Sequence, residues 1–170
     1  MYSNLFSTPF FVEQVDLSKI ELEEAKLNKS FPSGLKTTFH AKTKFKEESE
    51  EYLKKILAKN LDKLGFPYTI EEIIGWKNVY KKNDWQDPHF HSFSQFSFII
   101  YTGVEHSNTV FMNPNRQIIE SQCPMFKNYF RNYFKPDLVK GDMVIFPSFI
   151  EHYVVSGNVG ETVAGNVYIR

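Results

Sequence analysis

The stretch Asp87-Pro-His-Phe-His91 carries the strongest structural signal in this sequence. Alternate side chains on an extended chain leave the same face, so we expect His89 and His91 to point in one direction. A third histidine, His152, follows Gly141-Asp-Met-Val-Ile-Phe-Pro-Ser148, in which an apolar strand ends near a proline. If the strands that carry both stretches lie side by side in a small barrel, three imidazoles converge on one point.

Most of the chain after residue 67 has the alternating pattern of short β-strands. The 17 Phe and 9 Tyr among 170 residues favour sheets, because flat aromatic rings pack well on a pleated surface. Strands separated by turn residues are expected at 68–74, 76–81, 93–102, 109–113, 143–147, 152–155 and 162–169. This pattern predicts a single domain over residues 1–170 that folds as a β-sandwich or barrel.

One segment has a clear helical pattern. Between Lys46 and Leu64, apolar residues recur every three or four positions, acidic residues occupy the first turn and Gly65 follows the last turn. We expect this helix to cover a sheet from outside. Residues 16–29 carry a looser helical period and are a second candidate helix outside the sheet.

Three further segments have weaker patterns. Short strands are expected at 10–12 with 15–17 and at 35–39. The stretch 118–135 is aromatic and polar without clean alternation, and its part from Met125 to Phe134 is a candidate lid over a pocket mouth or a wall of a substrate groove.

Charge and cysteine content exclude several classes of function. Lys plus Arg and Asp plus Glu both number 20, so no net field draws nucleic acid or an anionic membrane to the whole molecule. Cys123 is the sole cysteine, which rules out an internal disulfide and a cluster of two thiolates on a metal. The first residues lack a signal-peptide pattern, and no apolar run is long enough to span a membrane. We therefore expect a soluble, cytoplasmic protein without nucleic-acid or membrane partners.

Histidines in this arrangement are typical of a catalytic metal site. Neutral imidazole binds Fe, Zn, Cu and Ni, and a site with three protein ligands leaves positions open for other molecules. The alternative for any one His is an ordinary hydrogen-bonded residue, and we assign His40 and His106 to that class. Asp87 shares the face of His89. It can be a ligand, a partner that orients an imidazole, or only a turn residue before Pro88.

Four segments together match one family of barrels. They are Trp76-Lys-Asn-Val-Tyr80, His89-Phe-His91, Ser97-Phe-Ile-Ile-Tyr101, and Gly141-Asp-Met-Val-Ile-Phe-Pro-Ser148 with His152. They resemble the double-stranded β-helix of 2-oxoglutarate and iron(II)-dependent oxygenases, and most closely the small oxygenases related to prolyl 4-hydroxylases. The resemblance covers most of the chain. It implies a mainly β fold with flanking helices, which is a cupin-like jelly roll (double-stranded β-helix). It also implies an enzyme that uses Fe(II), 2-oxoglutarate and dioxygen.

The resemblance also implies an activity and roles for individual residues. The activity is hydroxylation of a substrate, here a peptide side chain, coupled to decarboxylation of 2-oxoglutarate to succinate. His89 is the first metal ligand, His91 stands where most relatives have Asp or Glu, and His152 is the distal ligand. Tyr80 and Tyr101 match positions from which relatives hydrogen-bond the cosubstrate carboxylate. An inward-packed barrel tyrosine is the alternative for both.

One departure concerns the second carboxylate of 2-oxoglutarate. Relatives place Arg or Lys shortly after the distal His, where a cation can grip that carboxylate. The corresponding window here reads Gly160-Glu-Thr162 and holds no base. A buried dianion without a cation is costly. Arg170 and Arg116 are candidate substitutes, of which we assign Arg170 to the cosubstrate, and an exposed surface position is the alternative for each.

A second resemblance, to the cupins, shares the barrel and the three ligands but not the cosubstrate. Gly141 and His152 fit one cupin motif, while His89, His91 and Gln95 fit the other, with Gln95 in place of Glu. Three-His centres that do not use 2-oxoglutarate occur among cupins. A catalytically inactive binding module on the same fold is a third interpretation, because fold alone does not determine function.

Overall fold

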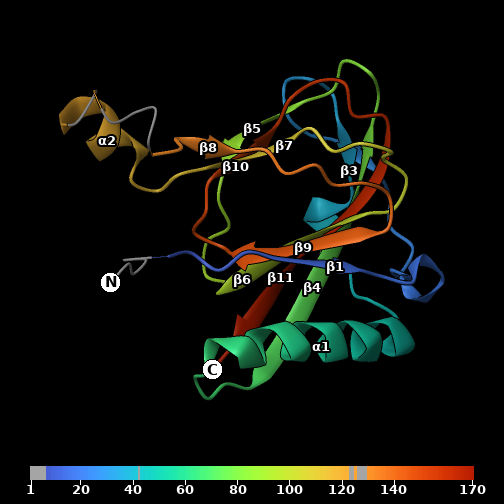
Figure 1. Cartoon of the computed structure of the whole chain (residues 1–170). Coiled ribbons are helices and arrows are strands. Elements are labelled where there is room, and N and C mark those ends of the chain that lie inside the picture. Colours follow the sequence, from blue (N-terminus) through green and yellow to red (C-terminus); the bar gives the residue numbers. More distant parts are fainter. Residues whose placement is uncertain (1–6, 42, 123–124, 126–129) are drawn as a thin grey trace.

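Two antiparallel sheets face each other, and a long helix covers the outer side of the larger one (Figure 1). The structure is a computed structural model that describes residues 7–41, 43–122, 125 and 130–170. The larger sheet has seven strands in the order β1 (Phe11–Gln14), β9 (Asp142–Pro147), β6 (Phe96–Tyr101), β11 (Gly160–Ile169), β4 (Ile70–Tyr80), β3 (Lys36–Thr37) and β2 (Asn28–Lys29). The smaller sheet has the order β5 (Gln86–His89), β10 (His152–Val154), β7 (Thr109–Met112) and β8 (Tyr133–Phe134). This is the mainly β jelly roll that the sequence predicts.

The central strand β11 shows how the period of two divides the larger sheet into two faces. Val163 and Val167 point to the side covered by the helix and belong to its apolar core. Thr162, Ala164 and Asn166 point instead to the space between the sheets, where they line cavities. One strand therefore contributes core on one face and site on the other.

The covering helix is α1 (Glu47–Leu61), which the short 3-10 helix η3 (Asp62–Leu64) extends. Leu53, Leu57 and Leu61 recur every four residues on one face, are fully buried, and pack in a cluster with strands β6 and β9. The helix starts with acidic residues and ends at Gly65, whose φ of 73° lies in the left-handed region. The predicted helix from Lys46 to Leu64 is confirmed.

A second apolar core lies between the two sheets. Trp76 of β4, Tyr101 of β6, Phe111 of β7 and Phe146 of β9 belong to it. The rings of Phe111 and Phe146 meet edge to face, with their centroids 4.9 Å apart. Polar side chains of the same strands are also buried in this space, and they form the site described below.

The predicted helix over residues 16–29 is wrong. The helical element in this segment is the 3-10 turn η1 (Leu17–Lys19), which the side chain of Asp16 caps, and the last two residues form strand β2. The following residues run extended beside residues 43–46: Glu23 N–H donates to Lys44 O, and Lys46 N–H donates to Glu21 O. Because a neighbouring segment accepts and supplies these hydrogen bonds, the weak helical period does not determine the backbone.

Two boundaries also differ from the prediction. The strands expected at 68–74 and 76–81 are one strand, β4, because Gly75 does not interrupt it. A side chain at this glycine would overlap the ring of Phe45, which packs there. The stretch 118–135 contains the end of α2 (Arg116–Gln122) and strand β8, and residues 123–124 and 126–129, Cys123 among them, lie outside the described part of the chain.

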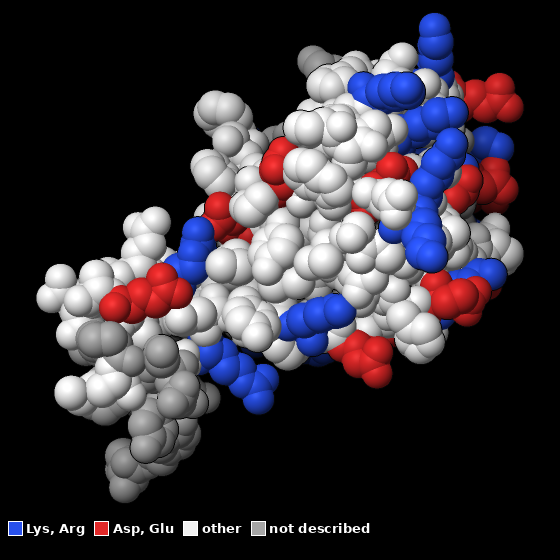
Figure 2. All heavy atoms as spheres, turned by 90° about the horizontal axis from the view of Figure 1, so that it is seen from above, with Lys and Arg blue, Asp and Glu red and all other residues white. Residues whose placement is uncertain are grey.

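Charged side chains do not form a large patch of one sign on the face seen from above (Figure 2). Acidic and basic residues are interspersed there, in agreement with the net charge of zero. Within the described ranges, no helix is long and apolar enough to cross a membrane.

Candidate metal centre

The structure brings His89, His91 and His152 together. β5 and β10 pair in a register that sets His89 opposite His152. One ring nitrogen from each of the three histidines lies within 4.8 Å of the others. The ring centroids of His89 and His152 are 4.4 Å apart, and that of His91 is 5.5 Å from His89 and 5.2 Å from His152. This is the convergence expected from the sequence, and a role as metal ligands remains a prediction.

His91 reaches this point by a different route from the one that alternation suggested. β5 ends at His89, so His91 follows the strand instead of lying on it. Its backbone N–H donates to Ser148 O over 2.9 Å, which ties it to the segment after β9. The position of this imidazole therefore depends on a contact with a distant part of the chain.

The Nδ1 atom of each imidazole faces an oxygen acceptor. His89 Nδ1 lies 2.7 Å from Asp87 O, and His152 Nδ1 lies 3.0 Å from Ile150 O. His91 Nδ1 lies 2.6 Å from Asn166 Oδ1. A carbonyl oxygen can only accept, so each Nδ1 carries the hydrogen and each Nε2 keeps a free lone pair. This arrangement is typical of imidazoles that bind metal through Nε2.

A buried polar network stands behind His91. Ser97 Oγ lies 2.9 Å from His91 Nδ1 and donates to Asn166 Oδ1 over 3.0 Å. Ser148 Oγ lies 2.7 Å from Ser97 Oγ, and Ser94 donates to it over 2.8 Å. Ser97 and Ser148 lie in segments that resemble the family but had no predicted role, and Asn166 was not predicted as a site residue. The available signal was a polar residue at an inward position of the apolar strand β11.

Burial keeps the three imidazoles neutral. It lowers the pKa of His91 to about 4 and lowers the pKa of His89 below its ordinary value. The pKa of His152 is lowered well below its ordinary value, first by burial and then by the two neighbouring imidazoles. Its side chain is only 3% exposed and packs against the rings of Phe111 and Phe146, so it does not lie at an open barrel mouth.

A cavity of about 20 Å³ lies inward of the histidines, and all three of them line it. Tyr80 also lines it and donates from its hydroxyl to Gln86 Oε1 over 2.6 Å. Tyr101 is fully buried and donates to Thr109 Oγ1 over 2.9 Å. It is not among the described residues that line this cavity. Burial raises the pKa of both tyrosines, that of Tyr101 to about 12, so their hydroxyls remain donors.

The structure does not bring Arg170 or Arg116 to this cavity. Arg170 is 84% exposed, and its Nε lies 3.1 Å from Glu71 Oε1. Arg116 pairs with Glu151 over 2.5 Å. Among the described residues that line the cavity, none is Lys or Arg.

The window where relatives carry a base has its own local structure. Gly160 has a φ of 122°, and a side chain there would overlap the carbonyl oxygen of Gly103. Glu161 pairs with Lys77 over 3.1 Å. Thr162 is the residue of this window that points inward, and it lines the cavity opposite Asn78 in the strand register. Asn78 Oδ1 is buried without a hydrogen-bond partner.

The donor set fits a first-row metal ion, because three neutral imidazoles with fixed Nδ1 hydrogens present three free lone pairs. Asp87 is not part of this set, and its contribution is the backbone oxygen that orients His89. The inner cavity fits 2-oxoglutarate less well. It offers hydroxyl and amide groups, but the lining residues that the structure describes include no cation for a second carboxylate.

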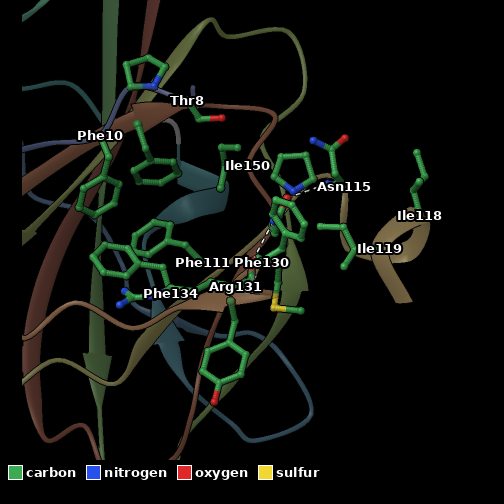
Figure 3. Close-up of a pocket in the computed structure, with 16 residues that line it drawn as sticks. Thr8, Phe10, Phe111, Asn115, Ile118, Ile119, Phe130, Arg131, Phe134 and Ile150 are labelled. Atoms are coloured by element: carbon green, nitrogen blue, oxygen red, sulfur yellow. Dashed lines mark hydrogen bonds between the residues drawn. The ribbon is translucent and has the colours of Figure 1, made fainter. Parts of the chain in front are cut away.

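In the aromatic stretch 125–134, expected as a lid or a groove wall, residues 126–129 lie outside the described part of the chain, and residues 130–134 do not line the cavity of the histidines. Phe130, Arg131 and Phe134 line a separate pocket of about 560 Å³, which Figure 3 shows between α2 and the rings of Phe10 and Phe111. None of the three histidines is among its described lining residues. Phe111 and Phe146, whose rings pack on His152, form its inner wall and separate it from the histidines.

Comparisons with known proteins agree with this fold. A family model described as "Putative 2OG-Fe(II) oxygenase" matches residues 75–162, which include all three histidines. A comparison with curated proteins finds no match. Similar solved structures include a prolyl-4-hydroxylase from Pseudomonas putida, at 12% identity over 96% of this chain and 94% of that chain, with a TM-score of 0.55.

Two further solved structures have comparable scores. HygX from Streptomyces hygroscopicus, with nickel, 2-oxoglutarate and hygromycin B bound, is 9% identical over 95% of this chain and 82% of that chain, with a TM-score of 0.53. An oxidoreductase of the 2OG-Fe(II) oxygenase family from Burkholderia pseudomallei is 14% identical over 90% of this chain and 74% of that chain, with a TM-score of 0.52. At such identities the likeness shows the fold, which is the double-stranded β-helix that the sequence predicted.

Proposed function

The chain belongs to the 2OG-Fe(II) oxygenase family, and on that premise we propose that it hydroxylates its substrate with Fe(II) held by His89, His91 and His152. The family implies the metal and 2-oxoglutarate as cosubstrate, and the proposal adds these ligands and the hydroxylation. The common orientation of the three rings supports it most. Each Nδ1 hydrogen is bound by a carbonyl oxygen, so three Nε2 lone pairs remain for one ion.

When bound, Fe(II) and 2-oxoglutarate supply the chemistry by which dioxygen oxidises the substrate. The residues of this chain hold and shield the site. The carbonyl groups of Asp87, Ile150 and Asn166 fix the ring orientations. Phe111 and Phe146 exclude water from one side of His152. The protonated hydroxyl of Tyr80 is a donor at the wall of the inner cavity.

The ligand set has a consequence for charge. Three neutral imidazoles leave both positive charges of a divalent ion uncompensated by the protein. An ion held by these three residues would therefore attract one carboxylate of 2-oxoglutarate more strongly than an ion beside an Asp or Glu ligand. The second carboxylate would lack such a partner, because no Lys or Arg is among the described residues that line the inner cavity.

A second candidate function rests on that observation. A metal enzyme with three His ligands that does not use 2-oxoglutarate needs no base inside the barrel. A cavity of about 20 Å³ without Lys or Arg among its described lining residues favours such an enzyme. An inactive binding module on the same fold remains the third interpretation, and the two experiments below separate all three.

The first experiment tests the metal site. Anaerobic titration of the chain with Fe(II), followed by calorimetry, should give one ion per chain. His152→Gln should abolish this binding while the protein stays folded, because Gln retains much of the buried volume that Ala would empty. His40→Gln serves as the control, since His40 lies outside the cluster. Unchanged Fe(II) affinity in His152→Gln would remove this residue from the site.

The second experiment tests the cosubstrate. The Fe(II)-loaded chain is incubated with 2-oxoglutarate and dioxygen, and succinate is measured against the His152→Gln variant. Succinate formation above that control supports the proposed function. Tight Fe(II) binding supports the second candidate if 2-oxoglutarate does not change the affinity and no succinate forms. Absence of metal binding supports the inactive module.

A further inference from the structure

We propose that a charge-free trough beside His91 binds an extended peptide with uncharged side chains, which specifies the substrate class and rests on the proposed function. The trough consists of two adjoining hollows. The first, of about 620 Å³, includes Phe31, Phe39 and Trp76 in its lining. The second, of about 940 Å³, includes Phe66, Phe93 and Phe149. The two hollows share Phe90, His91 and Ser92.

The trough leads to the metal centre. His89 and His91 line the first hollow, and Trp76, Asn78 and Gln86 line both that hollow and the inner cavity that all three histidines face. A group that occupies the first hollow therefore lies next to two of the proposed ligands. The pocket of Figure 3 lacks this property, since Phe111 and Phe146 separate it from the histidines.

The described lining residues of the trough carry no carboxylate, ammonium or guanidinium group. Among the described residues around both hollows there is no Asp, Glu, Lys or Arg. Charged residues make up 24% of the chain, so their absence over so many surface positions does not follow from composition. Away from the metal ligands, a charged side chain placed in this trough would lose hydration without gaining a partner. The occupant is therefore uncharged wherever it touches the trough outside the metal centre.

Exposed phenylalanines mark the trough as a binding surface. Phe90, Phe93 and Phe149 are 60%, 92% and 62% exposed, and Phe39 and Phe66 are also exposed. Contiguous apolar surface of this kind is a sign of a binding site, because its contact with water is unfavourable.

Two of the lining residues also have an unusual backbone. Phe31 and Phe93, with φ of 63° and 72°, are the non-glycine residues with positive φ in the described chain. That conformation costs free energy for a bulky residue, and such residues concentrate at functional sites.

The shape favours a peptide over a small molecule. Each hollow alone has the volume of a small-molecule pocket, and the segment from Phe90 to Ser92 lines both of them. An extended chain that passes over this segment can place one side chain in each hollow. Asn78 supplies a polar contact for it. This residue is 3% exposed, its Oδ1 has no partner, and it lines the first hollow, so it can accept from an N–H of the occupant.

The test uses a synthetic library of capped hexapeptides that is randomised over all amino acids. The library is passed over the immobilised full chain loaded with Zn(II), and retained peptides are sequenced by mass spectrometry. We expect Lys and Arg at every position, and Asp and Glu at every position except the one next to Zn(II), to be depleted at least fivefold in the retained peptides. Free N-acetylated amino-acid amides, passed over the same protein, should be retained at least tenfold more weakly than the selected peptides.

Variants connect retention to the trough. Phe93→Asn combined with Phe149→Ser should abolish retention, and the fold should persist because both rings are exposed and Asn tolerates a positive φ. Ile118→Asp, at an exposed apolar residue of α2, is the matched control and should retain the same peptides. Zn(II) affinity should be equal in all three proteins.

The outcomes separate this proposal from the proposed function. Retained peptides without charge depletion, equal retention of the single amino-acid amides, or full retention by the double variant would each overturn the trough, whatever the succinate assay shows. Selective retention that the double variant abolishes supports the trough even if no succinate forms, in which case only the oxygenase proposal fails.

Discussion

At the level of single residues, the orientation of the histidines has two different origins. His89 and His152 each donate to the backbone oxygen two residues earlier, at Asp87 and Ile150. Those two orientations are local. His91 instead donates to Asn166, a side chain of β11 that is far away in sequence. The third ring therefore depends on how the strands assemble.

Asn166 should be needed for metal affinity. Asn166→Leu removes the acceptor of His91 Nδ1 and frees the ring to rotate, so Fe(II) affinity should fall roughly 10–100-fold, as is usual when such a partner of a metal ligand is lost. Calorimetric titration of the two proteins measures this change. Asn60→Leu, which replaces a buried asparagine of α1, is the control and should bind Fe(II) like the unsubstituted chain. Equal affinity in Asn166→Leu would mean that Ser97 alone orients the ring.

The metal-free protein should lose stability in mild acid. The folded pKa of His91 is about 4, below the value near 6.5 of an unfolded histidine, so below pH 6.5 the unfolded state binds more protons than the folded state. The contribution of neutral His91 to the free energy of unfolding is complete above pH 6.5 and declines as the pH falls towards 4. From pH 7 to pH 5, His91 should lower the free energy of unfolding by about 2 kcal/mol.

Urea unfolding in the presence of a chelator at both pH values measures this loss. In His91→Gln the loss should be smaller, whereas His106→Gln, at an exposed histidine outside the cluster, should keep it. A free energy of unfolding that is equal at pH 7 and pH 5 would show that the cluster is open to solvent.

At the level of elements, the start of β11 occupies the window in which relatives carry a base. A close approach between Gly160 and Gly103 occupies the start of this strand, and alternation then turns Thr162 inward and Glu161 outward. A basic side chain at Gly160 would meet the backbone of the neighbouring segment. This contact excludes a base at Gly160, and at the inward position of the window the inner cavity receives the hydroxyl group of Thr162.

Gly160→Ala should be strongly destabilising. Ala is strained at a φ of 122°, and its side chain would also overlap Gly103 O, so we expect a loss of about 1–3 kcal/mol in the free energy of unfolding. Gly34→Ala is the matched control, since Gly34 also has a positive φ but no atom lies where its side chain would go. Thermal unfolding of both variants separates the cost of the overlap with Gly103 O from the cost of placing Ala at a positive φ. Equal losses would show that the contact with Gly103 yields easily.

At the level of the whole molecule, the larger sheet separates stability from function. Its outer face packs on α1 through a cluster that includes Leu53, Leu57 and Phe98. Its inner face carries Trp76, Asn78 and Asn166, which line the site. The two faces share the same strands but not the same side chains, so a change on one face should reach the other only weakly.

Leu57→Ala should therefore affect stability alone. Leu57 is fully buried under the sheet, and its loss should lower the free energy of unfolding by about 2–5 kcal/mol. Fe(II) affinity should stay unchanged in conditions where the variant is folded. Phe111→Leu is the contrasting variant, because the ring of Phe111 packs on His152. This substitution should lower both the free energy of unfolding and the Fe(II) affinity. Weaker Fe(II) binding in Leu57→Ala would contradict this separation.

Much of this architecture followed from the amino-acid sequence. The helix up to Leu64 and the strands with period two could be predicted, because residue spacing and turn residues act over a few positions. The grouping of His89, His91 and His152 was predicted on the condition that their strands lie side by side in a barrel, and β5 and β10 do pair. The same reasoning failed at residues 16–29, where backbone hydrogen bonds come from the distant segment 43–46. It also missed Asn166 and Asn78, whose roles depend on which strand lies next to which.

The three-dimensional structure was required to find the contacts between segments that are distant in sequence. It showed that His91 is held by Ser148 and Asn166, that Arg170 pairs with Glu71 on the surface, and that the stretch around Phe134 lines a separate pocket. The physical reason is one of range. The direction of a side chain along a strand is set by its immediate neighbours, whereas its partners and its exposure to water are set by segments that only folding brings close.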